Sequence, residues 1–334
     1  MLKGLLNDSG HRATMDSWTS NPKVQTKRAD LVKKKIQKLI SDGPSLLQVV
    51  SDFDGTLSRS HFEGRTIKSS FCVVENDPRV ISILSAEALE AYRLMNEKYV
   101  AIEVDPSLTR EEKFPHMVKW WTDSYATLVK AGIQDEHLRD IARRGEILLR
   151  CRTPDMLKLL EANDIPCLVF SAGIGEIVSY TLTHNQVLLS NVKVISNYFK
   201  FTDTANGTKA QAPEQLVHTY NKNAEHPIAK EYFSRKEVQL RRNVILLGDN
   251  LGDAHMIDRA PFIVQGPSNG CPNEVQFNDI HGGSSSYSTV LRIGFLNSKI
   301  EDRLSSFLEH FDIVLLDDQT MNVPFEIFKA ITAV

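Results

Sequence analysis

Residues 49–58, Val-Val-Ser-Asp-Phe-Asp-Gly-Thr-Leu-Ser, decide how this chain is expected to fold and where its chemistry is expected to lie. An apolar run ends in two acids, Asp52 and Asp54, and Gly55 and Thr56 follow at once. Residues two apart in an extended segment project to the same side. Two carboxylates this close repel each other unless a cation neutralises them. Mg²⁺, which binds carboxylates together with a substrate phosphate, is the cation that we expect here. The stretch predicts a phosphoryl-transfer site, and the alternative is an Asp-Gly turn that only caps a buried strand.

Composition limits the class of protein. The chain has 334 residues, of which 42% are hydrophobic and 24% charged, so we expect one large globular domain or two of ordinary size. A net charge of −3 weighs against a nucleic-acid polymer as partner. No apolar run approaches the roughly 20 residues of a membrane helix, and the four scattered cysteines suggest neither a disulfide framework nor a zinc site. We therefore expect a cytoplasmic monomer without membrane contact.

Apolar strand patterns alternate with helical ones along most of the chain. This alternation predicts an α/β fold with a Rossmann-like parallel sheet, covered by helices on both faces. The predicted strands are 46–50, 165–170, 192–196, 244–247, 262–265 and 312–316, and helices are predicted at 29–41 and 324–332.

A strongly helical block interrupts the alternation between the first and second strands. It runs from about 75 to 162, with one short extended segment predicted at 99–105. Its size predicts a helical cap domain of residues 71–159, inserted into a Rossmann-like core domain of residues 28–70 and 160–334. Residues 1–27 are polar and patternless, and they are expected to form a flexible tail.

Two further strand ends carry groups that suit a phosphate site. Ser171-Ala172-Gly173 follows the second strand, where a hydroxyl and backbone amides can hold phosphoryl oxygens, although an ordinary strand-to-helix turn has the same pattern. Asp249 and Asp253 follow the strand at 244–247 and can complete a Mg²⁺ shell. The carboxyl ends of parallel strands meet at one edge of a sheet, so these groups are expected close to Asp52.

A site with several carboxylates and a phosphate dianion also needs a fixed positive charge. Lys209 and Lys222 are the candidates between the second and third clusters. Sequence position alone does not choose between them.

Several segments together resemble a known family. SDFDGTLS at 51–58, VFSAGIGEIV at 169–178, VHTYNK at 217–222 and ILLGDNLGD at 245–253 resemble the four motifs of the haloacid-dehalogenase-like phosphohydrolases. YVAIEVDPSLTREEKFPHMVKWWTDS at 99–124 and LRIGFLN at 291–297 extend the resemblance to the cytosolic 5′-nucleotidase III (pyrimidine 5′-nucleotidase) family. The similarity covers roughly residues 30–334.

The resemblance implies a role for each matching position. It implies Asp52 as the nucleophile and Asp54 as the general acid/base. Mg²⁺ is the implied cofactor, held by the carboxylates of Asp52 and Asp249 and by the backbone carbonyl of Asp54. It also implies that Asp253 supports the metal site. Ser171, the Ala172 amide and Lys222 are implied to bind the phosphate. Glu103 and Ser124 are implied to contact the base.

The segment 99–124 is expected to set specificity. Glu103 can accept hydrogen bonds from an amino group or ring N–H of a base, although a surface salt bridge is the simpler interpretation of an isolated Glu. Trp120 and Trp121 offer faces for stacking, and Trp is the strongest partner for a cationic ring such as 7-methylguanine. We predict that Trp121 stacks on the base and that Trp120 packs within the helix.

The sequence thus predicts a Mg²⁺-dependent 5′-nucleotidase. Its expected substrates are CMP and UMP, 7-methyl-GMP, or both, hydrolysed through an aspartyl-phosphate. Transfer of the phosphoryl group to a second nucleoside is an alternative, as is a phosphatase for a small metabolite such as phosphoserine. A nucleotide-binding protein with a relict site is disfavoured, because all four motifs keep chemically competent residues.

Overall fold

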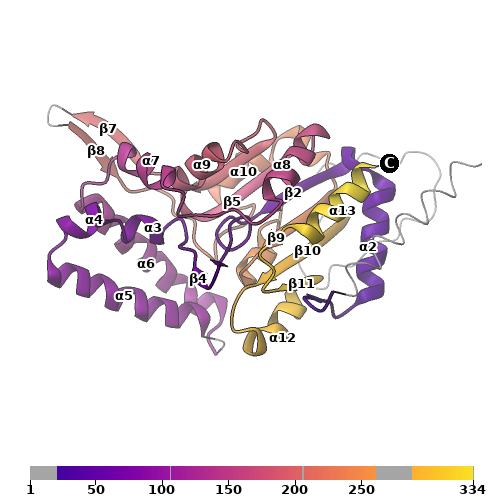
Figure 1. Ribbon diagram of the computed structural model, residues 1–334, viewed down its shortest axis with the longest axis horizontal. Coiled ribbons are helices and arrows are strands. Elements are labelled where there is room, and N and C mark those ends of the chain that lie inside the picture. Colours follow the sequence, from indigo (N-terminus) through magenta and orange to yellow (C-terminus); the bar gives the residue numbers. More distant parts are fainter. Residues whose placement is uncertain (1–20, 106, 205–206, 261–287, 334) are drawn as a thin grey trace, which may run out of the picture.

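The computed structural model describes residues 21–105, 107–204, 207–260 and 288–333, and its centre is a seven-stranded sheet (Figure 1). The strand order is β1-β11-β10-β9-β2-β5-β6, and every neighbouring pair is parallel except β1 with β11. The predicted α/β class with a Rossmann-like parallel sheet is confirmed. The strands are β1 (Val24–Gln25), β2 (Leu47–Ser51), β5 (Cys167–Ile174), β6 (Val192–Asn197), β9 (Asn243–Gly248), β10 (Thr289–Leu296) and β11 (Ile313–Leu316).

Three of these strands bring the predicted motifs to one edge. β2 lies between β5 and β9, and Val49 pairs with Cys167 on one side and with Ile245 on the other. Because the three strands are parallel and in this register, the residues that follow them leave the sheet at the same edge. The fold therefore collects the acids and the Ser171 segment at a single place.

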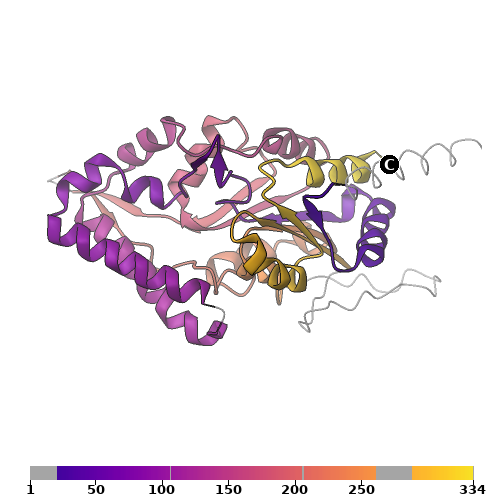
Figure 2. The ribbon, with the colours of Figure 1, turned by 60° about the horizontal axis from the view of Figure 1, so that its bottom comes forward.

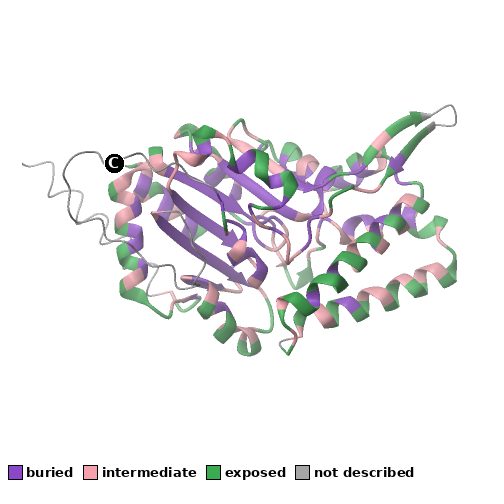
Figure 3. Ribbon diagram, turned by 180° about the vertical axis from the view of Figure 1, so that it is seen from behind, coloured by how far each residue is buried: buried purple, intermediate pink, exposed green. Residues whose placement is uncertain are grey.

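Helices cover both faces of the sheet, and successive strand residues point to opposite faces. Val49 and Ile245 pack on one face, whereas Val50 and Leu246 pack on the other. The strand interiors are buried, as expected for a parallel sheet covered on both sides (Figure 3). The first face is covered by α2 (Ala29–Asp42), α8 (Thr153–Ala162), α9 (Gly175–His184) and α13 (Asn322–Thr332), and the second by α10 (Pro227–Phe233), α11 (Lys236–Gln239) and α12 (Ile300–His310).

The helices between β4 (Arg65–Thr66) and α8 lie beside one end of the sheet, and the last of them packs against α9 (Figures 1 and 2). We call this group the cap. Its two longest helices, α5 and α6, pack against each other. Helix α6 begins with a capping box formed by Thr109 and Glu112. The cap helices are α3 (Cys72–Glu75), α4 (Pro78–Ile83), α5 (Ala86–Val104), α6 (Arg110–Lys130) and α7 (Asp135–Arg143).

The prediction of an extended segment at 99–105 is wrong, because α5 continues to Val104. The β-branched residues Val100, Ile102 and Val104 favour a strand locally. Packing overrides this preference, since the helical conformation stacks the ring of Tyr99 on that of Trp120, with centroids 6.0 Å apart and planes at 18°. Glu103 consequently lies in the last turn of a helix.

Other boundaries also differ from the expectations. β1 lies inside the predicted tail, where Val24 pairs with Leu315 and is buried, so the polar composition of the segment hid a short edge strand. The boundary at 159/160 falls within α8, which packs on α13. The strand predicted at 262–265 lies outside the described residues, and the strand β10 was not predicted. The short elements are β3 (His61–Phe62) with β4 (Arg65–Thr66), β7 (Lys200–Thr204) with β8 (Gly207–Gln211), η1 (Pro44–Leu46) and η2 (Leu251–His255).

Among the helices in the described ranges, none combines the length and the apolar character that a membrane span requires.

Candidate active site

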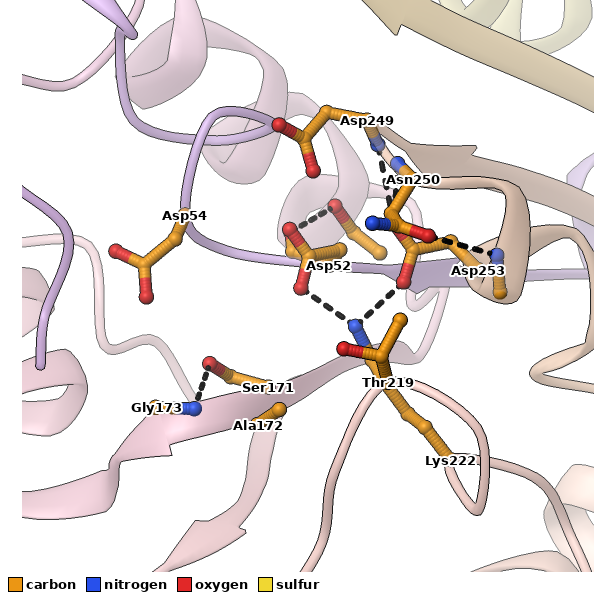
Figure 4. Close-up of polar contacts among 12 residues, drawn as sticks. Asp52, Asp54, Ser171, Ala172, Gly173, Thr219, Lys222, Asp249, Asn250 and Asp253 are labelled. Carbon is orange, nitrogen blue, oxygen red and sulfur yellow. Dashed lines mark hydrogen bonds and ion pairs between the residues drawn. The ribbon is translucent and has the colours of Figure 1, made fainter. Parts of the chain in front are cut away.

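The two aspartates of the first motif point to different partners. The backbone N–H of Asp52 donates to the Leu247 carbonyl at 2.9 Å, which extends the β2–β9 ladder by one residue and fixes Asp52 at the strand end. The chain then turns, so that Asp54 lies apart from Asp52 (Figure 4). Its carboxylate accepts from the N–H of Ser70 at 2.7 Å and also from the Ser70 hydroxyl. Both acids lie at the sheet edge, but only Asp52 joins the acidic cluster.

That cluster consists of Asp52, Asp249 and Asp253. One carboxylate oxygen from each lies within 4.8 Å of the others. Asp253 organises the turn that carries Asp249, because its Oδ2 accepts from the backbone N–H groups of Asp249 and Asn250, both at 3.0 Å. The first residue of the turn has to be Gly248, since a Cβ there would lie 2.3 Å from Cβ of Asp253. The conformation of the 249–253 turn is thus fixed by the carboxylate of Asp253.

Lys222 supplies the fixed positive charge. Its Nζ donates to Oδ1 of Asp52 at 2.5 Å and to Oδ1 of Asp253 at 2.7 Å, and its side chain is buried (Figure 4). Lys209 lies instead on the exposed strand β8. The geometry therefore selects Lys222 from the two candidates.

The electrostatics of the cluster fit a divalent cation. Burial raises the pKa of Asp52 to about 7, Lys222 opposes this shift, and Asp253 adds to it. Burial, with Asp52 and Asp253, also raises the pKa of Asp249 well above its ordinary value. Oδ2 of Asp52 is buried and has no hydrogen-bond partner among the described residues. One lysine leaves negative charge uncompensated, and a hard cation held by these carboxylates would balance it.

The end of β5 lies beside the acids. Ser171 is buried and its Oγ accepts from the N–H of Gly173 at 3.1 Å. The Ala172 carbonyl accepts from Nδ2 of Asn197 at 2.9 Å. A Cβ on Gly173 would lie 1.8 Å from Oγ of Ser70, so only glycine lets this strand approach Asp54 and its partner so closely. The predicted phosphate-binding segment is therefore next to both aspartates (Figure 4).

The sequence interpretation missed a buried arginine behind the first motif. Arg150 has no exposed surface, and its guanidinium donates to the backbone carbonyls of Gly55, Thr56 and Asp318. It also donates to Oδ1 of Asn297 at 2.7 Å, and Nδ2 of Asn297 lies 3.2 Å from Oδ2 of Asp249. Burial lowers the pKa of Arg150 to about 10, but the group remains a cation at neutral pH. A lone Arg after a helical segment carries no motif, so no signal in one sequence could reveal this role.

The backbone conformation at Gly55 and its closeness to Asp249 account for the glycine in the first motif. Its φ of 72° lies in the left-handed region, and a Cβ there would lie 2.2 Å from Oδ2 of Asp249. The positive φ favours glycine, and a side chain at this position would force the carboxylate of Asp249 to move.

The cap brings Glu103 to the loop of Lys222. Oε1 of Glu103 accepts from the hydroxyl of Thr219 at 2.7 Å, and the side chain is half-buried. Burial raises the pKa of Glu103, and the hydrogen bond from Thr219 opposes that shift. Glu103 is therefore not the surface salt bridge that its sequence context allowed.

The two tryptophans have different environments. Nε1 of Trp121 donates to the Ala172 carbonyl at 2.9 Å, so this ring lies against the predicted phosphate-binding segment. Nε1 of Trp120 donates to Oδ1 of Asn96 at 2.7 Å, inside the cap. Ser124 is buried within α6. Of the two rings, Trp121 lies at the junction between the cap and the site.

Comparison with known proteins shows what the chain is similar to. Residues 55–265 and 275–332 match the profile of the pyrimidine 5′-nucleotidase (UMPH-1) family. The 7-methylguanosine phosphate-specific 5′-nucleotidase A of Xenopus laevis is 33% identical over 299 residues, which is 90% of this chain and 92% of that protein. The Homo sapiens 7-methylguanosine phosphate-specific 5′-nucleotidase is 34% identical over 292 residues, 87% of each chain. The crystal structure of cytosolic 5′-nucleotidase IIIB bound to cytidine matches with a TM-score of 0.74 at 30% identity, over 93% of this chain and 94% of that one.

Proposed function

Since the chain belongs to the pyrimidine 5′-nucleotidase (UMPH-1) family and is a 5′-nucleotidase, a phosphoric monoester hydrolase, we propose that it hydrolyses nucleoside 5′-monophosphates with Mg²⁺ through a phosphorylated Asp52. The observation that carries this proposal is the setting of Asp52. One oxygen of its carboxylate is held by Lys222, and the other is buried without a partner among the described residues. A fixed carboxylate with a free oxygen is suited to attack phosphorus.

Asp54 is the proposed general acid and base. Ser70 holds both oxygens of its carboxylate, and burial raises its pKa, which favours the protonated form that a general acid needs. In the first step, Asp52 bonds to phosphorus while the P–O bond to the nucleoside breaks and Asp54 protonates the departing 5′-oxygen. In the second step, Asp54 takes a proton from the water that releases phosphate from Asp52.

The phosphoryl oxygens need positive partners in both steps. Lys222 and the Ser171 segment are the protein groups placed to supply them. Mg²⁺ would be held by the carboxylates of Asp52 and Asp249 and by the backbone carbonyl of Asp54. When bound, it supplies the charge that lets an anionic nucleophile approach an anionic phosphate. Asp253 supports this arrangement, because its own oxygens are engaged by the 249–253 turn and by Lys222.

For the substrate, we propose 7-methyl-GMP together with the pyrimidine monophosphates CMP and UMP. The names of the relatives support the first, and the cytidine in the matching crystal structure supports the second. Glu103 is the proposed acceptor for base N–H groups, and Trp121 is the proposed stacking surface, with Ser124 near the base. A cationic methylated purine gains more from a Trp face than a neutral base does.

A phosphate-release screen tests the proposal. The purified chain is assayed with CMP, UMP, 7-methyl-GMP, AMP and phosphoserine, with Mg²⁺ and after its removal by a chelator. We expect release from the first three substrates, loss with the chelator, and recovery on adding Mg²⁺. Asp52→Asn should lower the rate by at least ~10³-fold, whereas Asp123→Asn at an exposed acid should not. Faster release from phosphoserine than from any nucleotide, or near-normal hydrolysis by Asp52→Asn, contradicts the proposal.

A further inference from the structure

One short loop, residues 217–222, links the cap to the acidic cluster. At its start, the backbone of Val217 is fixed to the side chain of Asn197, with N–H to Oδ1 at 2.7 Å and Nδ2 to the carbonyl at 2.8 Å. At its end, Lys222 enters the cluster of acids. The loop is therefore anchored to the core at both ends.

The middle of the loop holds the end of helix α5. The Thr219 hydroxyl donates to Oε1 of Glu103 at 2.7 Å, and the Tyr220 hydroxyl donates to the backbone carbonyl of Glu103 at 2.9 Å. Nζ of Lys113 donates to the same carbonyl at 2.9 Å. The last carbonyls of a helix lack partners within the helix, so these two donors satisfy one of them. They also fix where Glu103 lies.

A second cap helix, α6, also contacts this loop. The guanidinium of Arg110, at the start of α6, donates to the Tyr220 carbonyl at 3.1 and 2.6 Å. On the core side, the Thr219 carbonyl lies so close to Gly252 that a Cβ there would be 2.4 Å away. Thr219 thus touches the turn of Asp249 through its backbone and Glu103 through its side chain.

Only one oxygen of the Glu103 carboxylate is engaged. Oε1 accepts from Thr219, and Oε2 has no hydrogen bond from any residue that the structure describes. The hydrogen bond from Thr219 lowers the pKa of Glu103, which burial raises, so it favours the carboxylate form. A carboxylate with one oxygen fixed presents the other in a defined direction.

We propose that Thr219 is a positioning residue for nucleoside recognition: its hydroxyl holds Glu103 so that the second carboxylate oxygen meets an N–H or amino group of the base. The inference rests on the proposed function, because it assumes that Glu103 faces the base. It assigns to Thr219 a role in choosing the substrate, whereas Lys222, three residues later in the same loop, serves the phosphate.

The test is a double-mutant cycle with two kinds of substrate. Thr219→Val, Glu103→Gln and the double variant are compared with the wild type on CMP, 7-methyl-GMP and p-nitrophenyl phosphate, which has no base. The measured quantity is kcat/KM for a nucleotide divided by kcat/KM for p-nitrophenyl phosphate. Thr219→Val should lower this ratio about tenfold, mainly through a higher KM for the nucleotide, as expected for losing a hydrogen bond to a charged group.

Two further variants separate positioning from general damage. Thr219→Ser keeps the hydroxyl and should restore the ratio to within about twofold of the wild type. Thr208→Val removes an exposed hydroxyl that donates to Asp203 at 2.9 Å in the β7–β8 hairpin, and it should leave the ratio unchanged. The double variant should be no worse than Glu103→Gln alone, because both substitutions remove the same interaction.

Three results would overturn the inference while the proposed function stands. They are a lower KM for nucleotides in Thr219→Val, an equal loss on p-nitrophenyl phosphate, and effects of Thr219→Val and Glu103→Gln that multiply in the double variant. The first would show that Thr219 competes with the base for Glu103. A wild-type chain that releases phosphate from no nucleoside monophosphate would instead overturn the proposed function.

Discussion

The carboxyl edge of the sheet and the end of the cap are held in place by different interactions. At the sheet edge, neighbouring strands fix the backbone, and buried charges such as Asp52 and Lys222 then pair directly. At the cap, hydrogen bonds from side chains, such as Thr219 to Glu103 and Trp121 to Ala172, join helices to core loops. Rigid strand ends suit chemistry that all substrates share, and adjustable side-chain contacts suit discrimination between bases.

The largest effect on stability and activity is expected from replacing Arg150, which holds the backbone of the turn after Asp54. Arg150→Met removes a buried cation and leaves the backbone carbonyls of Thr56 and Asp318 without their donor, whereas the Gly55 carbonyl keeps Nδ2 of Asn297 at 2.9 Å. The free energy of unfolding should fall by about 3 kcal/mol, and activity should fall for every substrate alike. Urea unfolding and phosphate release measure the two quantities.

The neighbouring arginine provides the matched control for that substitution. Arg152 is partly exposed and pairs with Glu326 at 3.2 Å, so Arg152→Met should change the free energy of unfolding by less than about 1 kcal/mol. If the two variants behave alike, Arg150 does not support the nucleophile turn.

A smaller effect is expected at a buried acid outside the site. Glu176 accepts from the N–H of Phe199 at 2.8 Å, its Oε2 has no partner among the described residues, and burial raises its pKa to about 7. The unfolded chain loses this proton near the ordinary pKa, before the folded chain does. Stability should therefore fall as the pH rises from about 4.5 to 7 and should then level off.

Glu176→Gln removes that titration and keeps an oxygen for Phe199. At pH 8 the variant should be more stable than the wild type by about 2 kcal/mol, and at pH 4.5 the two should be similar. Thermal unfolding across this pH range measures the difference. The opposite dependence, with a gain only at low pH, would show that Glu176 is stabilised in its charged form. Activity should not change, because Glu176 lies outside the site.

The smallest effect should appear only in the choice of base. Trp121→Tyr should lower the preference for 7-methyl-GMP over CMP by about three- to tenfold, because Tyr is a weaker partner for a cationic ring. Trp120→Tyr is the matched control, since this ring stacks on Tyr99 inside the cap. An unchanged preference in Trp121→Tyr, or an equal change in Trp120→Tyr, would remove Trp121 from the base site.

The same contrast explains what the sequence could predict. Asp52, Asp249 and Lys222 were identifiable because acids and a lysine follow strands in recognisable motifs, and parallel strands bring their ends together. The support by Arg150 and the contact from Thr219 to Glu103 depend on residues 94 and 116 positions apart, which no local pattern records. The extended segment predicted at 99–105 failed for a related reason, because packing of Tyr99 on Trp120 outweighed the local preference for strand.

The central claim is that Asp52 carries the phosphoryl group. Rapid acid quenching of the enzyme during turnover of CMP or 7-methyl-GMP, followed by peptide mass spectrometry, tests it most directly. We expect the added mass of one phosphoryl group on the peptide containing Asp52, and no such mass in Asp52→Asn. A phosphorylated peptide that lacks Asp52, or an active Asp52→Asn enzyme, would contradict it.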